Sequence, residues 1–487
     1  MKTISLESMD DSFLAFCWRN LHPRDRTKIL GDAKRTLWIF GAGASHHYGL
    51  SRYGVLTPLA TGFFQAFHQL PTSQGFAAHV GPFISFLQHY RGVSPTEVYK
   101  WDENIEDFMT SIEEELTHLQ QSLMGGRLEG KDFEKAFSFG TVFANMNFIF
   151  ANVLNEAQNG PSDSLYRELL AFCGPNDAFV TFNWDTLLDR ALVDSGGWSP
   201  NQGYGLKFGA ILDGTWKAAV ENEPQFPTHW KLLKLHGSTN WLVPYMGVDP
   251  KTLVYQSIVP DSTEVFLFWQ STMPYLTHHG RWRGGYPATC YCYYPPNIPA
   301  NFFAVEQIAA PEGHIFTSFT LKLFSPFSEP SDNGVPSSPL LITPVRQKRY
   351  ERYKSTIGTL WDQAVDLLEE VDRIVIVGYS FPVTDSRTLD LIRGVLSSRA
   401  GSIELEVVAP GVSEIAARIG EDALSKAKSV TTHDKTFEDY MEVLAEKMPG
   451  LMRNAAENDA EVRKWLEVVY VMKEISSHLN IPPGEIE

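Results

Sequence analysis

Cysteine is scarce in this chain, with only four Cys among 487 residues. Cys17 and Cys173 stand alone, and Cys290 and Cys292 form a C-x-C pair. Neither a disulfide framework nor a zinc ribbon built from paired C-x-x-C motifs can be read from this pattern. Such low cysteine usage is typical of a reducing compartment, and we expect a cytoplasmic protein.

Basic residues are also in the minority. The chain has 41 Lys and Arg against 58 Asp and Glu, which gives a formal net charge of −17. A surface of this sign repels phosphate backbones, so we expect no direct contact with nucleic acid. The first sixteen residues contain acids where an export signal would be apolar, so we read no such signal there.

Long, purely apolar stretches are absent as well. The most apolar window, residues 137–154, contains Asn145, Asn147 and Asn152, which favours a buried helix over a membrane span. We therefore expect no membrane contact. Apolar residues still make up 43% of the chain, enough for a globular protein, and the length predicts two or three structural units.

Compact apolar runs end in glycine-rich or polar turns and alternate with helical periodicity. These runs, which predict buried strands, cover residues 37–40, 178–182, 231–235, 373–377 and 403–409. The pattern predicts an α/β fold: a Rossmann-like parallel sheet with helices on both faces. We also expect a long helix over 348–371, and we expect the last sixty residues to be helical and to end in a solvated tail.

The same pattern divides the chain into units. We expect a helical lead-in (1–30), a sheet domain in two pieces (31–245 and 341–445), an irregular insertion or cap rich in aromatic residues and proline (246–340), and a helical carboxyl segment (446–487). In a parallel sheet, ligands bind at the carboxyl ends of the strands. The turns that follow the expected strands should therefore converge on one crevice.

Two of these turns are rich in glycine. Glycine lets main-chain N–H groups approach a phosphate, although an ordinary strand-to-helix turn uses the same residue. One turn ends at Pro382 and includes Gly378 and Ser380, with Asp385 as a helix N-cap a few residues later. The other turn consists of Gly41, Ala42, Gly43, Ala44 and Ser45.

Two further turns carry polar side chains. Asn183 and Asp185 follow one expected strand and put an amide and a carboxylate at its end, where either residue could also cap a helix. His236 follows another strand, with Gly237 leaving room beside it. Such a histidine can act as a base or orient a ribose hydroxyl near neutral pH, and a structural histidine is the alternative.

Taken in order, the strings GAGAS, TFNWD, KLHGSTNW and GYSFPVTD resemble the sirtuin-like fold. In particular they resemble the sirtuin-like NAD-degrading proteins of bacterial anti-phage defence, over roughly residues 31–245 and 345–445. The resemblance implies that residues 41–45 hold the NAD phosphates and that Asn183 and His236 are catalytic. It also implies that Asp185 lines the nicotinamide side and that Gly378 and Ser380 contact the adenosine half.

The resemblance implies an NAD hydrolase that cleaves the nicotinamide–ribose bond and depletes NAD on phage infection. Nicotinamide leaves as a neutral base, so no general acid is needed, and the enzyme must stabilise an oxocarbenium-like centre and place a water against it. We assign Asn183 to positioning the ribose or the water, and His236 to orienting the ribose hydroxyls and accepting a proton. An unregulated hydrolase would kill its host, which implies control by homo-oligomer assembly, a co-encoded ATPase or a phage-derived activator.

Two departures from the sirtuin deacylases count against deacylation: the C-x-x-C ribbon is missing, and an aromatic-rich insertion follows Trp241. Transfer of ADP-ribose to an acceptor, deacylation, and a non-catalytic subunit that senses NAD or ADP-ribose all stay open as alternatives. We expect no bound metal, although one weaker pattern could hold zinc: His278, His279, Cys290 and Cys292. His46 and His47 lie beside the glycine turn, where they could touch a ligand or simply lie on a helix surface. The basic cluster 348–354 is interpreted as a solvated helix face, with contact to an acidic partner as the alternative.

Overall fold

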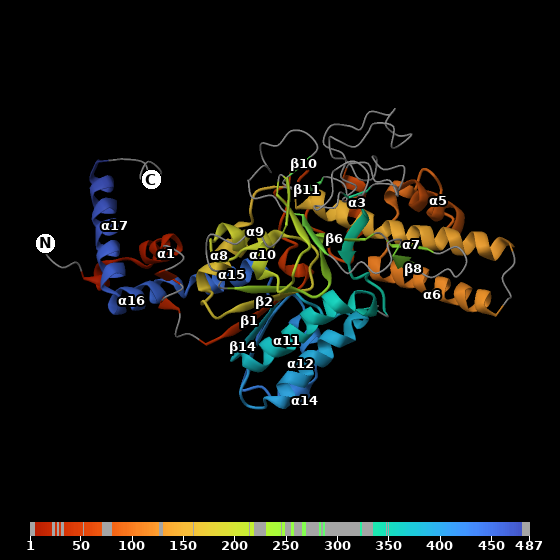
Figure 1. Cartoon of the computed structure of the whole chain (residues 1–487). Helices are drawn as coiled ribbons and strands as arrows, with labels where there is room; N and C mark the ends of the chain where they lie inside the picture. Colours follow the sequence, from red (N-terminus) through yellow and green to blue (C-terminus); the bar gives the residue numbers. More distant parts are fainter. Residues whose placement is uncertain are drawn as a thin grey trace.

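The computed structural model describes residues 5–21, 25–26, 29–30, 34–51, 53–70, 80–125, 130–158, 160–213, 215–218, 230–244, 246–248, 255–257, 265–268, 282–283, 286–287, 322–323, 335–346, 348 and 350–479. Its centre is a six-stranded sheet in the order β16-β15-β14-β1-β2-β5, in which every neighbouring pair is parallel. The strands are β1 (Thr36–Phe40), β2 (Ala178–Thr181), β5 (Lys231–Lys234), β14 (Arg373–Val377), β15 (Glu404–Val408) and β16 (Ser429–His433). With helices packed around the sheet, this confirms the predicted Rossmann-like α/β arrangement (Figure 1).

The inner strands form because their side chains are apolar on both faces. All five side chains of β1 and all four of β2 are buried, which is typical of a parallel sheet covered on both sides. β16 is different, since its side chains are mostly exposed, and it lies at the edge of the sheet. The expectation that the last sixty residues are helical is wrong at this strand.

The helices around the sheet are α8 (Ser164–Leu169), α9 (Leu187–Asp194), α11 (Thr359–Glu370), α12 (Ser386–Ser398), α13 (Val412–Ile419), α14 (Glu421–Leu424) and α15 (Phe437–Ala445). The helix expected over 348–371 becomes α-helical only at Thr359. A 3₁₀ turn (Tyr350–Tyr353) and a π-helical turn (Lys354–Gly358) come first. At the start of this stretch, Lys348 and Tyr350 contact polar groups at the edge of the sheet.

A second sheet is connected to the first through the short link between β5 and β6. It has the order β12-β13-β6-β9-β3-β4 and contains β3 (Ala210–Asp213), β4 (Thr215–Ala218), β6 (Gly237–Pro244), β9 (Phe266–Phe268), β12 (Lys322–Leu323) and β13 (Val335–Leu341). The chain passes from β5 to β6 at Gly237, where φ is +82° and a Cβ would lie 2.0 Å from the carbonyl oxygen of Leu340. Only glycine fits this corner. Two short pairs complete the strands: β7 (Met246–Val248) with β8 (Tyr255–Ser257), and β10 (Trp282–Arg283) with β11 (Tyr286–Pro287).

An aromatic-rich helical layer lies beside the sheets (Figure 1). It consists of α3 (Phe63–Gln69), α5 (Val80–Tyr90), α6 (Ile105–Met124) and α7 (Gly130–Ala157), which share one apolar core. Among the described helices, α7 alone is long and apolar enough to cross a membrane, and 81% of its apolar window is buried within the protein. Phe150 of α7 stacks on Trp184 at 5.4 Å, which ties this layer to the end of β2.

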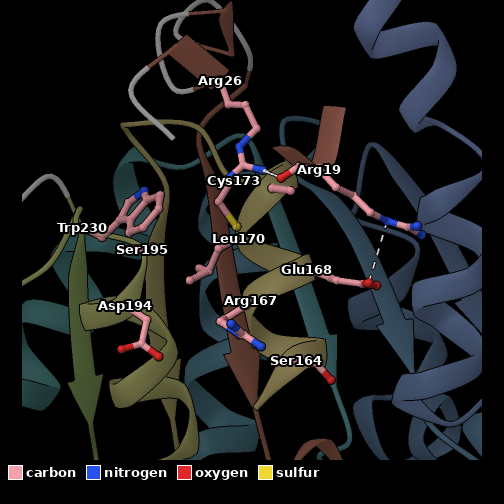
Figure 2. Close-up of a pocket in the computed structure, with 11 residues that line it drawn as sticks. Arg19, Arg26, Ser164, Arg167, Glu168, Leu170, Cys173, Asp194, Ser195 and Trp230 are labelled. Carbon is pink, nitrogen blue, oxygen red and sulfur yellow. Dashed lines mark hydrogen bonds and ion pairs between the residues drawn. The ribbon is translucent and has the colours of Figure 1, made fainter. Parts of the chain in front are cut away.

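Helices from the two ends of the chain form a third core. α1 (Asp11–Asn20) packs against α16 (Met448–Asn458), and α17 (Ala460–Leu479) completes the cluster. Trp18, Met448 and Leu466 are fully buried there. Between this cluster and the parallel sheet lies a cavity of about 320 Å³, next to the residues that precede β2 and β5 (Figure 2).

Candidate functional site

All four motifs follow strands of the parallel sheet, so they lie on one edge. Gly41 follows β1, Asn183 comes two residues after β2, His236 two residues after β5, and Gly378 directly follows β14. These are four adjacent strands, in the order β14-β1-β2-β5. The structure thus places the predicted site residues along the carboxyl edge, the edge at which ligands bind in open α/β sheets.

The two glycine turns pack directly against each other. The N–H of Gly41 donates to Val377 O at 3.0 Å, and that of Gly43 donates to Gly378 O at 2.9 Å. A Cβ on Gly41 would lie 2.5 Å from Tyr379 Cα, and one on Gly378 would lie 2.2 Å from the backbone nitrogen of Ala44. Close approach of the two loops is therefore the first reason for glycine here.

Because of this packing, most of the N–H groups that the resemblance assigns to the NAD phosphates already donate hydrogen bonds within the protein. Four of the five N–H groups in the turn, those of Gly41, Gly43, Ala44 and Ser45, donate to carbonyls of the protein itself. Ser380, which the resemblance assigns to the adenosine half, is exposed, and its carbonyl accepts a hydrogen bond from Arg418 at 2.8 Å.

Asn183 links the end of β2 to the glycine turn 41–45 through hydrogen bonds. Its Nδ2 donates to Gly41 O at 2.9 Å and to Ser45 Oγ at 3.1 Å, and its side chain is nearly buried. Ser45 Oγ is also hydrogen-bonded to the Tyr166 hydroxyl at 3.1 Å. The helix-cap alternative for Asn183 is wrong, because α9 starts at Leu187 with Thr186 as its N-cap.

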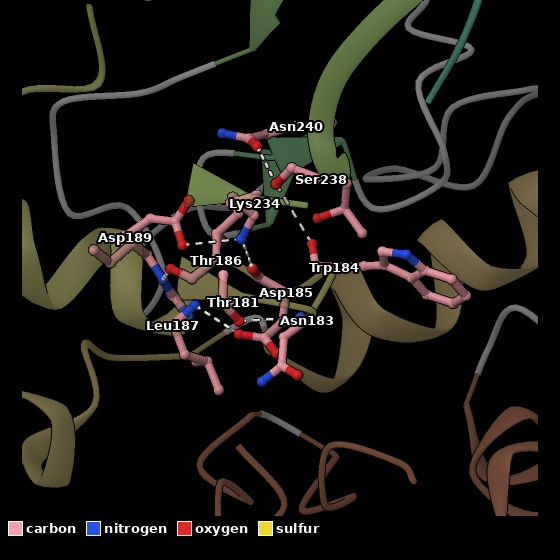
Figure 3. A network of polar contacts seen from close by, with 12 residues as sticks. Thr181, Asn183, Trp184, Asp185, Thr186, Leu187, Asp189, Lys234, Ser238 and Asn240 are labelled. Carbon is pink, nitrogen blue, oxygen red and sulfur yellow. Dashed lines mark hydrogen bonds and ion pairs between the residues drawn. The ribbon is translucent and has the colours of Figure 1, made fainter. Parts of the chain in front are cut away.

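Asp185 belongs to a buried network that joins β2 to β5 (Figure 3). Its Oδ1 accepts the N–H of Leu187 at 3.0 Å, and its backbone carbonyl accepts from Lys234. The Lys234 ammonium is neutralised by Asp189 at 3.1 Å, with neither side chain more than 1% exposed. Burial raises the pKa of Asp185 above its ordinary value. In this structure Asp185 therefore organises the first turn of α9.

His236 lies in a separate polar cluster that reaches across the edge of the sheet. Its Nε2 is 3.1 Å from Asp385 Oδ2 and 3.3 Å from the Tyr350 hydroxyl. Lys348 Nζ is 3.3 Å from the same carboxylate oxygen and 3.5 Å from Nε2, and the Tyr379 hydroxyl donates to Asp385. Asp385 occupies the N-cap position of α12, as predicted, but its side chain makes no capping hydrogen bond there.

Burial and the contacts between the charged groups together set the charge states in this cluster. Burial, followed by the nearby Lys348 ammonium, lowers the pKa of His236 below its ordinary value. Burial also lowers the pKa of Lys348. Burial alone would raise the pKa of Asp385, but His236 and Lys348 outweigh it and hold that pKa well below its usual range. At neutral pH the cluster therefore pairs an ionised carboxylate with a neutral imidazole, the form that accepts protons.

Phe182 connects the two halves of the site. Its ring lies 5.0 Å from the His236 ring and stacks on Tyr379 at 4.4 Å, while the next residue is Asn183. Within the described part of the chain, no hydrogen bond joins Asn183 to His236. The amide is bound to the loop after β1, and the imidazole to residues around β14.

The partners of His236 were not predicted from the sequence. Lys348 is only 5% exposed, so the interpretation of cluster 348–354 as a solvated helix face is wrong at this residue. Glu106 also reaches this area, where it accepts a hydrogen bond from Thr384 at 2.9 Å, and burial raises its pKa. Within a basic stretch of sequence, no local pattern indicates which lysine is buried. Contacts with partners more than a hundred residues away cannot be read from local patterns.

The other candidates serve the framework or lie elsewhere. His46 Nδ1 is 2.7 Å from Thr57 O, and His47 Nε2 is 2.8 Å from Asp163. His278, His279, Cys290 and Cys292 lie outside the described residues, and no metal-binding group of three His, Cys, Asp or Glu occurs within them.

No protein-family model matches the sequence, and no curated protein matches it.

Proposed function

We propose that this protein is an NAD⁺ hydrolase that cleaves the nicotinamide–ribose bond to give nicotinamide and ADP-ribose. The observation that carries the proposal is the buried His236–Asp385 pair at the carboxyl edge of a parallel sheet, with Asn183 just after the end of the neighbouring strand. The order of the four motifs, which resembles that of sirtuin-like NAD-degrading proteins, supports NAD as the substrate.

The proposed reaction needs one water and one proton acceptor. The bond between ribose C1′ and the nicotinamide nitrogen breaks, and its electron pair leaves with the neutral base. Water forms the new C–O bond, and His236, neutral because burial lowers its pKa, accepts a water proton. Asp385, 3.1 Å from Nε2, then stabilises the resulting imidazolium.

Asn183 has the positioning role in this proposal. Its Nδ2 is used by Gly41 and Ser45, which fixes the orientation of the amide. The carbonyl oxygen Oδ1 then accepts a hydrogen bond from a ribose hydroxyl or from the attacking water. Such an oriented acceptor lowers the barrier by holding the reactants in place.

The biological part of the proposal follows from the same resemblance. The protein depletes NAD in the cytoplasm during phage infection, and its activity is controlled by assembly with further copies of itself, a co-encoded ATPase or a phage-derived activator. Neither metal, nucleic acid nor membrane takes part.

The test is to incubate the purified full-length protein with NAD⁺ or etheno-NAD and to measure nicotinamide and ADP-ribose by chromatography. Lysates from infected and uninfected cells are added in separate reactions. We expect His236→Ala and Asn183→Ala each to lower kcat by about a hundredfold or more with little change in KM. His89→Ala, on the exposed side of α5, is the matched control and keeps full activity.

Three results would contradict the proposal. If both alanine variants hydrolyse NAD at the wild-type rate, the assigned residues are wrong. If nicotinamide appears only when a protein acceptor is present, the reaction is transfer or deacylation. If NAD binds but no nicotinamide is released even with infected-cell lysate, the protein is a non-catalytic sensor.

A further inference from the structure

The cavity next to the starts of β2 and β5 lies at the opposite, amino edge of the parallel sheet. Its volume is about 320 Å³, at the lower end of the range for small-molecule sites. It is lined by residues from α1, α8, the end of α9 and the segments that precede β2 and β5 (Figure 2). It is thus separate from the carboxyl edge that carries Asn183 and His236.

Three arginines from three different segments meet at this cavity, although acids outnumber bases in the chain by 58 to 41. Arg167 is exposed, and its guanidinium makes no hydrogen bond or ion pair with any described residue. Arg19 faces Glu168 at a loose 3.7 Å. Arg26 donates to the carbonyls of Trp18 and Arg19, but its Nε is buried without a partner.

The cavity is therefore lined by guanidinium groups that have hydrogen-bond donors without a partner among the described residues. A guanidinium offers five donors in a planar fork that matches phosphate oxygens, and such charge-assisted hydrogen bonds are the strong ones. Two carboxylates, Glu168 and Asp194, also line the cavity, so the three arginines leave it with a single excess positive charge. The electrostatics fit a ligand with one phosphate group and no further acid.

The rest of the lining is suited to a hydroxyl-bearing molecule. Asp194 and Trp230 lie on one side of the cavity, across from Arg19 and Glu168 (Figure 2). A carboxylate repels a bare anion but accepts hydrogen bonds from sugar hydroxyls, and the Ser195 hydroxyl beside it can also accept one.

We propose that this cavity binds a phosphorylated sugar. Arg167 binds the phosphate, Arg19 and Arg26 add positive potential around it, and Asp194 accepts hydrogen bonds from the sugar hydroxyls. The proposal does not depend on NAD hydrolysis, because it rests on a different edge of the sheet and on different residues.

The test is isothermal titration calorimetry of the full-length protein with ribose 5-phosphate at fixed ionic strength. Inorganic phosphate, ribose and AMP are titrated in parallel. We expect saturable binding of ribose 5-phosphate at one site, tighter than that of phosphate or ribose alone. AMP tells whether a base attached to the sugar is accepted: AMP binding as tightly as ribose 5-phosphate extends the ligand class to nucleotides, and weaker AMP binding restricts the site to the sugar.

Substitutions assign the two ends of the ligand. We expect Arg167→Ala to raise the Kd for ribose 5-phosphate about tenfold or more, and Arg167→Glu to abolish binding. Asp194→Asn should weaken ribose 5-phosphate binding and leave or improve phosphate binding. Arg35→Ala is the matched control, because Arg35 lies just before β1 and pairs with Glu370 on the surface, away from the cavity.

Arg167 and Asp194 are both exposed, so their variants should keep the wild-type circular dichroism spectrum and urea midpoint. Absence of saturable binding by ribose 5-phosphate would overturn the proposal. The same Kd in wild type and Arg167→Ala would overturn the role of Arg167. Equal affinity for inorganic phosphate and ribose 5-phosphate would refute the sugar half of the site.

Discussion

Replacing Asp385 by Asn removes the central charge of the His236 cluster while keeping the size of the side chain. In the wild type the two carboxylate oxygens of Asp385 face His236 at 3.1 Å, Lys348 at 3.3 Å and Tyr350 at 3.4 Å, and Tyr379 also donates to them. In Asp385→Asn, the Lys348 ammonium stays almost fully buried and loses the carboxylate that neutralises it.

The size of the effect follows from this burial. Removal of one partner from a buried ion pair costs about 3–5 kcal/mol of unfolding free energy, because the other charge is left buried without compensation. Replacement of both partners by neutral groups of similar size is nearly neutral. We therefore expect Asp385→Asn to lose about 3–5 kcal/mol, and Asp385→Asn combined with Lys348→Met to regain at least about 2 kcal/mol of that loss.

The assay is urea denaturation followed by tryptophan fluorescence and far-ultraviolet circular dichroism, applied to both single variants and the double variant. Asp390→Asn is the control, since Asp390 is an exposed residue of the same helix, α12, and should change stability by less than about 0.5 kcal/mol. The reasoning is refuted if Asp385→Asn stays within about 1 kcal/mol of the wild type. It is also refuted if the two substitutions are simply additive, because a direct ion pair requires coupling.

Two further predictions concern the same edge of the sheet. Gly378→Ala should destabilise the protein by about 3 kcal/mol or more, because φ is +62° and the new Cβ would lie 2.2 Å from a backbone atom. Gly401→Ala is the control: φ is +76° but the new Cβ enters open space, so this variant should lose only about 1 kcal/mol in the same urea assay. Equal losses in the two variants would contradict the packing argument. Stability should fall between pH 7 and pH 5 in part through His236, because the unfolded chain binds a proton there near its ordinary pKa of 6.5 while the folded protein does so only at lower pH. His236→Gln should lose less stability than the wild type over this interval, and an identical loss in both proteins would show that His236 does not contribute.

The central sheet could be predicted because burial on both faces forces its strands to be apolar throughout. The runs that became β1, β2, β5, β14 and β15 are apolar and end in turn residues, so their signal is local. β16 lacks that signal because it lies at the edge of the sheet with its side chains mostly exposed. Its place in the fold depends on pairing with β15, which no local pattern records.

The candidate site was predictable in position but not in its contacts. Asn183 and His236 lie on the expected edge because parallel strands end together. Their partners could not be predicted, because Lys348 and Asp385 reach His236 from segments more than a hundred residues further along the chain. The glycines could not show which role their turns have. A turn that binds phosphate and a turn that packs against another loop both require a residue without a Cβ.

The third core has a consequence for the newly made chain. α1 leaves the ribosome early, but α16 and α17, which cover Trp18 and its neighbours, are synthesised only after the whole parallel sheet. Until then the apolar side of α1 lacks most of its partners, since only Ala171 and a few side chains near it contact this core earlier, and it is open to chaperones or to other unfinished chains. Completion of this core therefore follows synthesis of the parallel sheet, and the amide protons of α1 should gain full protection from exchange only after α16 and α17 have been made.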